Sequence, residues 1–361
     1  MARSILEDAA SQSRTGALER VIPDVVTKPT KVLITGATGF LGKRLTKRLV
    51  DEGYSIRALV RKPSNMGDLE RLGAEIVFGD IGDESSIAAA VRGVDIVVHA
   101  AAGTSGTEKD SETGTIQGTR NVLEACRANR VEKLIYISSC NVYGVAGYTE
   151  NQLVTEEAQL EGFPLRRGHY TAAKLRAEAL VTEAMEHEGY PTVVLRPGTL
   201  YGPGTEVYTR MMGVSFARRI FVVFGDGTNE LPLIHVDNAV DAIVECMSNC
   251  AADNQVFNVV DHDLVTKKMY MERIVMPLYP KATVIYCPMP LLLILTWLQE
   301  KLLAILGKQP FLTVYRLVSS QKRVRYSTSR IANAIGWRSR IRFEQGAEQL
   351  IREHGRAADT K

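Results

Sequence analysis

The sequence predicts an α/β protein with a doubly wound parallel sheet and a smaller C-terminal substrate-binding domain. One observation is a strand, a glycine-rich turn and a helix in direct succession within residues 32–50. The other is a series of short apolar segments that alternate with helical segments as far as residue 137. Such alternation is typical of βαβ units, whose helices cover both faces of a parallel sheet.

The glycine-rich turn has the features of a diphosphate site in a Rossmann-type sheet. Gly36 permits a tight turn, Gly39 lets backbone N–H groups approach a diphosphate, and Gly42 lets the helix pack closely on the strand. The N-terminus of the following helix stabilises the phosphate charge. A glycine-rich loop without a ligand is the alternative, but the flanking strand and helix favour dinucleotide binding. The predicted binding residues here are Gly36, Thr38, Gly39, Phe40, Leu41 and Gly42.

Two basic residues favour NADP(H) over NAD(H). The strand at 55–60 is followed by Arg61 and Lys62, where an NAD site carries an acidic residue for the ribose 2′-OH. A guanidinium and an ammonium suit a 2′-phosphate instead. The alternative is that both side chains are merely solvated.

Later strand ends are expected to complete the dinucleotide site. The third strand ends near Asp80 and Ile81, where a carboxylate can accept a hydrogen bond from the adenine amino group. Three small residues, Ala100, Ala101 and Ala102, follow the fourth strand and leave room for a flat ligand. The predicted elements are strands at 74–78, 94–99 and 134–137 and helices at 85–92 and 119–129.

A serine, a tyrosine and a lysine carry the predicted chemistry. Ser139 follows the fifth strand, and Tyr170 and Lys174 lie one turn apart on a helix predicted at 170–188. We expect the Lys174 ammonium to lower the pKa of the Tyr170 phenol, so that it exchanges a proton with a carbonyl or alcohol. This Tyr–Lys spacing is common on surface helices, but its order after a glycine turn and a strand-end serine predicts catalysis.

At this point the chain resembles the extended short-chain dehydrogenase/reductase family, which includes the NAD-dependent epimerase/dehydratases. The resemblance extends over residues 31–355 and rests on segments 36–42, 79–81, 99–102, 138–144, 170–174, 195–203, 235–238 and 331–337. It implies Tyr170 as acid/base, with Ser139 and Lys174 as its catalytic partners, and Lys174 also bound to the nicotinamide ribose. It further implies Thr119, Pro197 and Thr199 as cofactor-binding residues, and a homodimer through the helix that carries Tyr170.

Departures from the family pattern narrow the range of reactions expected for this chain. Cys140 and Asn141 stand where sugar-nucleotide dehydratases of the family carry an acidic pair. Thr199 and Thr115 each replace an Asn that is usual in the family. The segment after the Gly-Asp-Gly motif lacks a diphosphate-binding Arg, and Glu230 in it would repel a diphosphate.

A leucine-rich segment at 288–306 suggests an apolar partner or substrate. A helix that is apolar nearly all round must bury itself in protein, ligand or membrane surface, and this one is too short to span a bilayer. A core or dimer helix is the alternative. The segment resembles that of 3β-hydroxysteroid dehydrogenase-type members, which act on sterol or other lipid substrates. This resemblance implies a substrate cleft formed by 208–219 and 267–297, and possible peripheral membrane contact through 288–306.

The composition is that of an ordinary globular protein of 361 residues, 45% hydrophobic and 24% charged. The formal net charge of +3 is too small to indicate nucleic-acid binding. Five cysteines show no metal-binding spacing, so we expect reduced thiols and no metal site, with Cys246 and Cys250 on one helix. Residues 1–30 have no signal-peptide pattern, so we expect a cytoplasmic protein, with association at the inner face of a membrane as an option.

The sequence therefore predicts an NAD(P)-dependent oxidoreductase that interconverts a ketone and a secondary alcohol on a bulky apolar substrate, sterol-like or a long-chain lipid. One alternative is an epimerase or reductase acting on a nucleotide-activated sugar, and another is a scaffold that senses NADP without catalysis. We expect Asp237 to cap the helix ending at Ser248 or to be its structural partner. The predicted domains are an extension at 1–30, a dinucleotide-binding domain at 31–202 plus 234–263, and a substrate domain at 203–233 plus 264–361.

Overall fold

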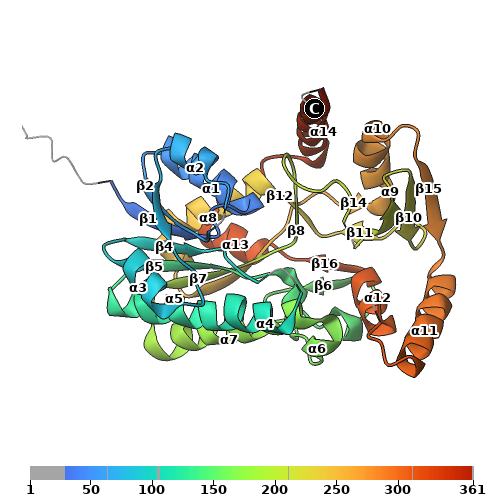
Figure 1. Cartoon of the computed structure of the whole chain (residues 1–361), viewed down its shortest axis with the longest axis horizontal. Coiled ribbons are helices and arrows are strands. Elements are labelled where there is room, and N and C mark those ends of the chain that lie inside the picture. Colours follow the sequence, from blue (N-terminus) through green and yellow to red (C-terminus); the bar gives the residue numbers. More distant parts are fainter. Residues whose placement is uncertain (1–28, 63, 104–105, 210, 311, 360–361) are drawn as a thin grey trace, which may run out of the picture.

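A seven-stranded parallel sheet lies at the centre of the computed structural model, which describes residues 29–359 except 63, 104, 105, 210 and 311. The strand order is β13-β7-β5-β4-β1-β2-β3, so the doubly wound sheet predicted from the sequence is confirmed (Figure 1). The extension predicted at 1–30 lies almost wholly outside the described residues. The strands of this sheet are β1 (Lys31–Thr35), β2 (Ser55–Val60), β3 (Glu75–Phe78), β4 (Ile96–His99), β5 (Lys133–Ile137), β7 (Thr192–Pro197) and β13 (Gln255–Val259).

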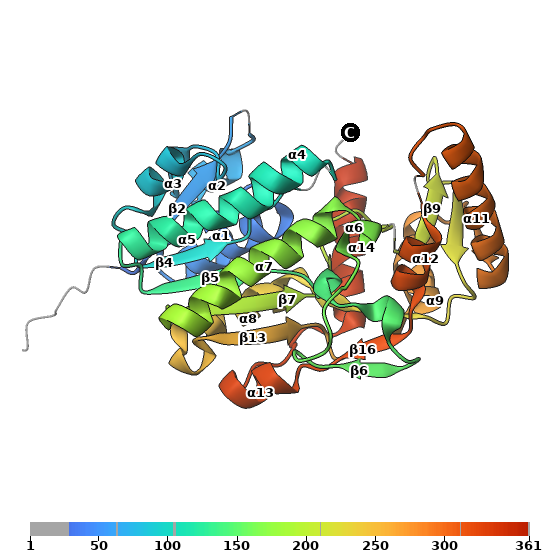
Figure 2. The same ribbon diagram turned by 90° about the horizontal axis from the view of Figure 1, so that it is seen from below.

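Helices cover both faces of the sheet, because its strands are apolar on both sides and each face must be buried. Figure 1 shows α1, α2 and α8 on one face and α3, α5 and α7 on the other, and Figure 2 views the second face directly. The predicted bounds in this region agree with the observed ones to within two residues. The helices of the first face are α1 (Phe40–Asp51), α2 (Gly67–Arg71), α8 (Val236–Ser248) and α13 (Ser329–Ile335). Those of the second face are α3 (Glu84–Val91), α5 (Gly118–Ala128) and α7 (His169–Glu188).

A smaller body stands beside the carboxyl ends of the large sheet. Its core joins Phe221 of a three-stranded sheet to Tyr270, Met271 and Phe343 from helical segments. Its elements are β9 (Gly213–Phe216), β10 (Ile220–Phe224), β15 (Thr283–Cys287), α9 (Lys267–Tyr270), η5 (Met271–Val275), α10 (Met276–Leu278), α11 (Met289–Ile305), α12 (Val314–Gln321) and α14 (Phe343–Asp359). The connecting elements are α4 (Glu108–Ser111), η1 (Glu112–Gln117), η2 (Cys140–Val142), η3 (Val145–Gly147), β6 (Gln152–Val154), α6 (Pro164–Arg167), β8 (Thr199–Tyr201), β11 (Glu230–Leu231), β12 (Leu233–His235), η4 (Cys250–Ala252), β14 (Val265–Thr266) and β16 (Val324–Tyr326).

The C-terminal segment does not pack as one unit. Ile331 and Trp337 are buried in the core above the large sheet, and β16 pairs with β6. The chain then returns to the smaller body, where Phe343 and Leu350 are buried. Segment 264–361, predicted as part of one substrate domain, therefore contributes to both cores.

Two local details differ from the sequence-based expectations. His235, rather than Asp237, caps α8, since its ring Nδ1 accepts the backbone N–H of Asp237 at 3.3 Å. Burial lowers the pKa of His235, which suits a neutral ring that accepts this bond. Cys246 lies within α8, whereas Cys250 begins the separate helix η4, so the two thiols do not share a helix.

Candidate active site

The glycine turn between β1 and α1 has the close backbone contacts that its spacing predicts. Gly36 has φ +78°, and a Cβ there would lie 2.9 Å from the backbone nitrogen of Ala101. A Cβ on Gly42 would lie 2.2 Å from the carbonyl oxygen of Gly36, so this glycine lets α1 sit against the turn without facing the cavity itself. Side chains larger than hydrogen would push the helix away from the strand end at which a diphosphate is expected.

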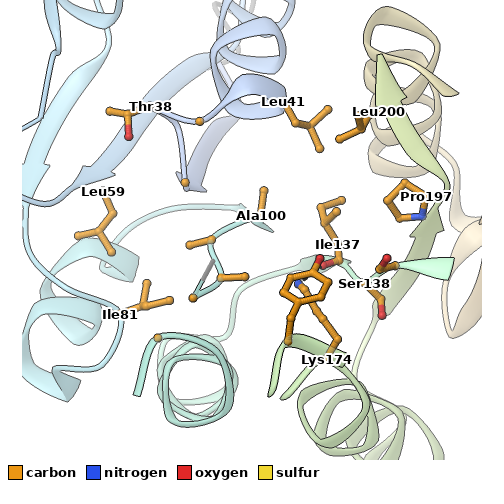
Figure 3. A pocket seen from close by; sticks show the side chains of 18 of the residues that line it. Thr38, Leu41, Leu59, Ile81, Ala100, Ile137, Ser138, Lys174, Pro197 and Leu200 are labelled. Carbon is orange, nitrogen blue, oxygen red and sulfur yellow. Dashed lines mark hydrogen bonds between the residues drawn. The ribbon is translucent and has the colours of Figure 1, made fainter. Parts of the chain in front are cut away.

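A cavity of about 380 Å³ runs from this turn along the carboxyl ends of the strands. Figure 3 shows Thr38, Leu59 and Ile81 at one end and Ser138, Lys174 and Pro197 at the other, with Ala100 between them. Most of the predicted cofactor residues line it. These are Gly36, Thr38, Gly39, Leu41, Arg61, Ile81, Ala100, Ala101, Ala102, Tyr170, Lys174 and Pro197.

The two basic residues predicted to select the cofactor lie at the far end. Arg61 lines both this cavity and an adjoining one, where Lys62 and Asp80 are also found. Arg61 is largely exposed and lies 3.8 Å from the Asp80 carboxylate, and the Lys62 ammonium lies 4.4 Å from the centre of the Phe78 ring. Neither cation is buried by protein, so both can reach an anionic ligand.

Besides Lys62 and Asp80, which line the adjoining cavity, four predicted cofactor residues do not line the first cavity: Phe40, Gly42, Thr119 and Thr199. Phe40 packs beside Gly204, where a Cβ would lie 3.7 Å from its ring. Thr119 is buried, and its hydroxyl lies 3.0 Å from the His99 ring. Thr199 faces a neighbouring cavity. Direct contact of these four residues with a cofactor therefore stays a prediction from the sequence.

The predicted catalytic residues meet at the end of β5. Lys174 is buried and donates a hydrogen bond to the carbonyl oxygen of Ile137 at 2.8 Å. Burial lowers the pKa of Lys174 to about 8, and the nearby Glu178 carboxylate opposes this change. The expected lowering of the Tyr170 pKa is wrong in direction. Burial raises it, and a hydrogen bond with Ser139 offsets only part of the rise.

A buried ion pair behind these residues was not anticipated from the sequence. Glu178 and Arg196 are almost wholly buried, and their closest N···O distance is 2.5 Å. Ser138 also donates to the Glu178 carboxylate, and the Arg196 guanidinium donates to the Tyr143 hydroxyl at 2.8 Å. One feature of the sequence does indicate that Glu178 lies near the catalytic residues: it follows Lys174 by one helical turn, on the same face of α7.

A second cavity, of about 530 Å³, meets the first at Ser139, Tyr170, Pro197 and Gly198. The segments predicted to form a substrate cleft, 208–219 and 267–297, contribute Met211 and Lys267 to its wall. A larger share of the wall comes from 229–232 and 312–326. Its apolar lining residues are Val145, Met211, Phe224, Leu231, Leu312, Val324 and Tyr326, and its charged ones are Arg167, Glu230, Lys267, Arg316 and Lys322.

The leucine-rich segment forms α11 at the edge of the smaller body (Figure 1). Leu292 is buried against Phe224 and Leu317, but much of the helix is open to solvent. At least half of the side chain is exposed at Ile294, Leu295, Trp297, Leu298, Leu302, Ile305 and Leu306. None of the described helices combines the length and apolarity that crossing a bilayer requires.

A dinucleotide cleft that ends at a serine, a tyrosine and a lysine defines an NAD-dependent dehydrogenase/reductase of the extended short-chain type. Residues 32–259 match the NAD dependent epimerase/dehydratase family. The chain belongs to this family, as its resemblance predicted.

Similar proteins with assigned activities include both reductases and epimerases. A 2-alkyl-3-oxoalkanoate reductase from Stenotrophomonas maltophilia is 33% identical over 58% of this chain and 62% of its own length. A UDP-glucose 4-epimerase from Vibrio cholerae is 30% identical over 68% of this chain and 75% of its own. A decarboxylating sterol-4-alpha-carboxylate 3-dehydrogenase from Dictyostelium discoideum is 26% identical over 88% of this chain and 99% of its own.

Solved structures show the same fold over nearly the whole chain. A UDP-glucose 4-epimerase from Thermotoga maritima, bound to UDP-glucose, has a TM-score of 0.70 and 20% identity, and the match covers 91% of this chain and all of the epimerase chain. At this identity the likeness concerns the fold and not the substrate.

Proposed function

We propose that the protein is an NADP(H)-dependent oxidoreductase that interconverts a ketone and a secondary alcohol on a bulky, largely apolar substrate. One observation carries the proposal. Ser139 and Tyr170 line both cavities, so one hydroxyl pair faces the dinucleotide cleft and the second cavity at once. A carbonyl group in the second cavity can therefore meet an acid and a nicotinamide at the same place.

The residues of the first cavity fit a dinucleotide. Gly36 and Gly39 line the cavity without side chains that would keep a diphosphate from their backbone, and the small residues after β4 leave space for a flat group. Arg61 and Lys62 support the choice of NADP(H), because both cations border the end of the cleft farthest from Tyr170. When bound, the nicotinamide supplies or accepts the hydride.

In the direction of reduction, Tyr170 donates its phenolic proton to the carbonyl oxygen of the substrate, while the Ser139 hydroxyl donates a hydrogen bond to the same oxygen. The raised pKa of Tyr170 keeps the phenol protonated near neutral pH, as an acid requires. Lys174, one turn along α7 and held by the Ile137 carbonyl, stabilises the phenolate that forms until solvent reprotonates it.

The apolar part of the second cavity supports a bulky substrate. Met211, Phe224, Leu231 and Leu312 lie on its wall, and burying apolar substrate surface against such side chains is favourable. The reductase and the sterol dehydrogenase among the similar proteins act, by their names, on 3-oxoalkanoates and on a sterol.

Cofactor consumption tests the proposal. The purified full chain is incubated with NADPH and a panel of long-chain 3-oxo compounds and 3-oxosterols, and the loss of absorbance at the wavelength specific to the reduced nicotinamide is recorded. The expected result is turnover that Tyr170→Phe lowers on the order of 100-fold or more. NADPH that is bound but never consumed with any ketone would contradict the proposal and favour the NADP-sensing scaffold.

An epimerase acting on a nucleotide-activated sugar is the second candidate. It is supported by the similarity to the Vibrio cholerae enzyme and by the basic residues of the second cavity. The expected repulsion by Glu230 is weaker than its charge suggests, because Arg325 binds this carboxylate through two hydrogen bonds of 2.6 and 2.8 Å. Conversion of UDP-glucose to its 4-epimer without net use of cofactor would identify this activity.

We also propose that α11 contacts a membrane surface at the cytoplasmic side. Leu295, Trp297 and Leu298 expose about half of their side chains on one helix, an arrangement typical of helices that lie in a bilayer interface. The strand β15 leads directly into α11, and its Ile285 is also exposed. Separately, we propose that the protein forms a homodimer whose interface includes α7, as the family resemblance implies.

A further inference from the structure

Arg316 is a cation in the second cavity that has no acceptor among the described residues. It lies on α12, and its guanidinium Nε is inaccessible to solvent without any hydrogen-bond partner there. The Arg316 side chain is only partly buried, so the cost concerns its Nε–H group, and burying such a donor without an acceptor is unfavourable. A group that arrives with the substrate would remove this cost.

The guanidinium lies beside the start of the helix that carries Tyr170. Gly168, two residues before Tyr170, has φ +118°, a conformation that favours glycine. A Cβ at this position would lie 3.1 Å from the Arg316 Nη2 atom. The glycine therefore leaves room for the arginine next to the catalytic tyrosine, and the positive end of α7 adds to the positive potential there.

A second polar side chain on α12 also lacks a partner. Ser319, one turn after Arg316, is 4% exposed and lines the same cavity. Its hydroxyl has no hydrogen-bond partner in the described part of the chain. Arg316 and Ser319 thus present one charged and one neutral donor to the same space, as a site for an anionic oxygen would.

The other charges of the cavity leave an excess of positive charge. Arg167 lies 3.6 Å from Glu161, and Lys322 lies 3.0 Å from Glu150, so each has a carboxylate nearby. Lys267 is buried and is held by two neutral groups, the Phe224 carbonyl at 2.7 Å and the Gln321 side chain. Burial lowers the pKa of this lysine to about 8, and the charge of the Asp226 carboxylate opposes this change, so the ammonium still predominates at neutral pH.

We propose that Arg316 binds a carboxylate that the substrate carries close to its reacting carbon. The inference rests on the proposed oxidoreductase function and specifies its substrate as a 3-oxo acid or the matching 3-hydroxy acid with an apolar remainder. The planar guanidinium matches a carboxylate through two parallel hydrogen bonds, and the place of Arg316 beside Gly168 sets the acid group near Tyr170. The apolar wall then receives the remainder of the molecule.

Binding to a non-reacting complex tests the inference without relying on turnover. The full chain is saturated with NADPH and titrated by calorimetry with a 2-alkyl-3-hydroxyalkanoate and, separately, with its methyl ester. The acid should bind about 10- to 100-fold more tightly than the ester, the range expected for hydrogen bonds to a charged group. Arg316→Leu should remove this preference, Arg316→Lys should keep part of it, and the exposed Arg352→Leu should not change it.

Equal binding of acid and ester by the unchanged protein, or a preference that survives in both Arg316→Leu and Arg316→Gln, would overturn the inference. Binding of UDP-glucose that is tighter than that of the acid and depends on Arg316 would also overturn it and would assign the arginine to a phosphate. Circular dichroism and NADPH binding show whether each variant is folded. Ketone turnover with no acid preference would refute this inference alone, whereas an Arg316-dependent preference without any turnover would refute the oxidoreductase function alone.

Discussion

Replacing Glu178 by Gln should be among the most destabilising conservative substitutions in this chain. Glu178 is 2% exposed and Arg196 is 4% exposed, so the pair is shielded from solvent. The amide would leave the Arg196 guanidinium without its counter-charge, and breaking a buried ion pair from one side costs about 3–5 kcal/mol. A loss of this size is a large share of the stability of a typical domain, which is about 5–15 kcal/mol.

Urea unfolding followed by circular dichroism measures this loss. Glu183→Gln on the exposed face of the same helix is the matched control and should change the free energy of unfolding by less than about 0.5 kcal/mol. Arg196→Met added to Glu178→Gln should recover part of the loss, because it removes the orphaned charge. A loss below about 1 kcal/mol for Glu178→Gln would refute the reasoning that the pair is buried and mutually dependent.

Four further outcomes are expected. Tyr170→Phe should lower kcat on the order of 100-fold or more while the Kd for NADPH stays unchanged in a fluorescence titration. Arg61→Ala should weaken NADPH binding about 10- to 100-fold with little effect on NADH, and equal effects on both cofactors would contradict a 2′-phosphate site. Because burial lowers the pKa of Lys174 to about 8, its ammonium is lost as the pH rises through that value, so kcat for reduction should fall on the alkaline side with a midpoint near there, measured at saturating cofactor. Leu295→Glu combined with Trp297→Glu should reduce co-sedimentation with anionic lipid vesicles, whereas an unchanged bound fraction but an altered sedimentation coefficient would indicate a protein partner.

The parts of the site that depend on local geometry could be predicted from the sequence. The roles of Gly36 and Gly42 depend only on contacts within one turn and its neighbours, and the placement of Tyr170 next to Lys174 depends only on the geometry of one helix. The spacing of the glycines alone therefore predicts the place of the dinucleotide cleft. The family match over 32–259 covers this same region.

The remainder depends on contacts between distant segments. The second cavity takes much of its wall from 312–326, and no periodicity in that segment shows that α12 packs beside the start of α7. The direction of the Tyr170 pKa was wrong because spacing shows the neighbouring ammonium but not the burial of the phenol, which has the larger effect. Glu230 was expected to repel anions since its partner, Arg325, is far from it in sequence.

The return of Ile331 and Trp337 to the core above the large sheet has a practical consequence. A recombinant fragment that stops at residue 263 would keep all seven strands but would expose the hydrophobic surface that these two side chains cover. Such a fragment should aggregate or fold poorly unless the stretch from β16 to Trp337 is supplied again, either as a separate peptide or through an engineered linker. The nucleotide-binding half of this enzyme is thus discontinuous in sequence, and deletion studies that assume a contiguous module would mistake misfolding for loss of function.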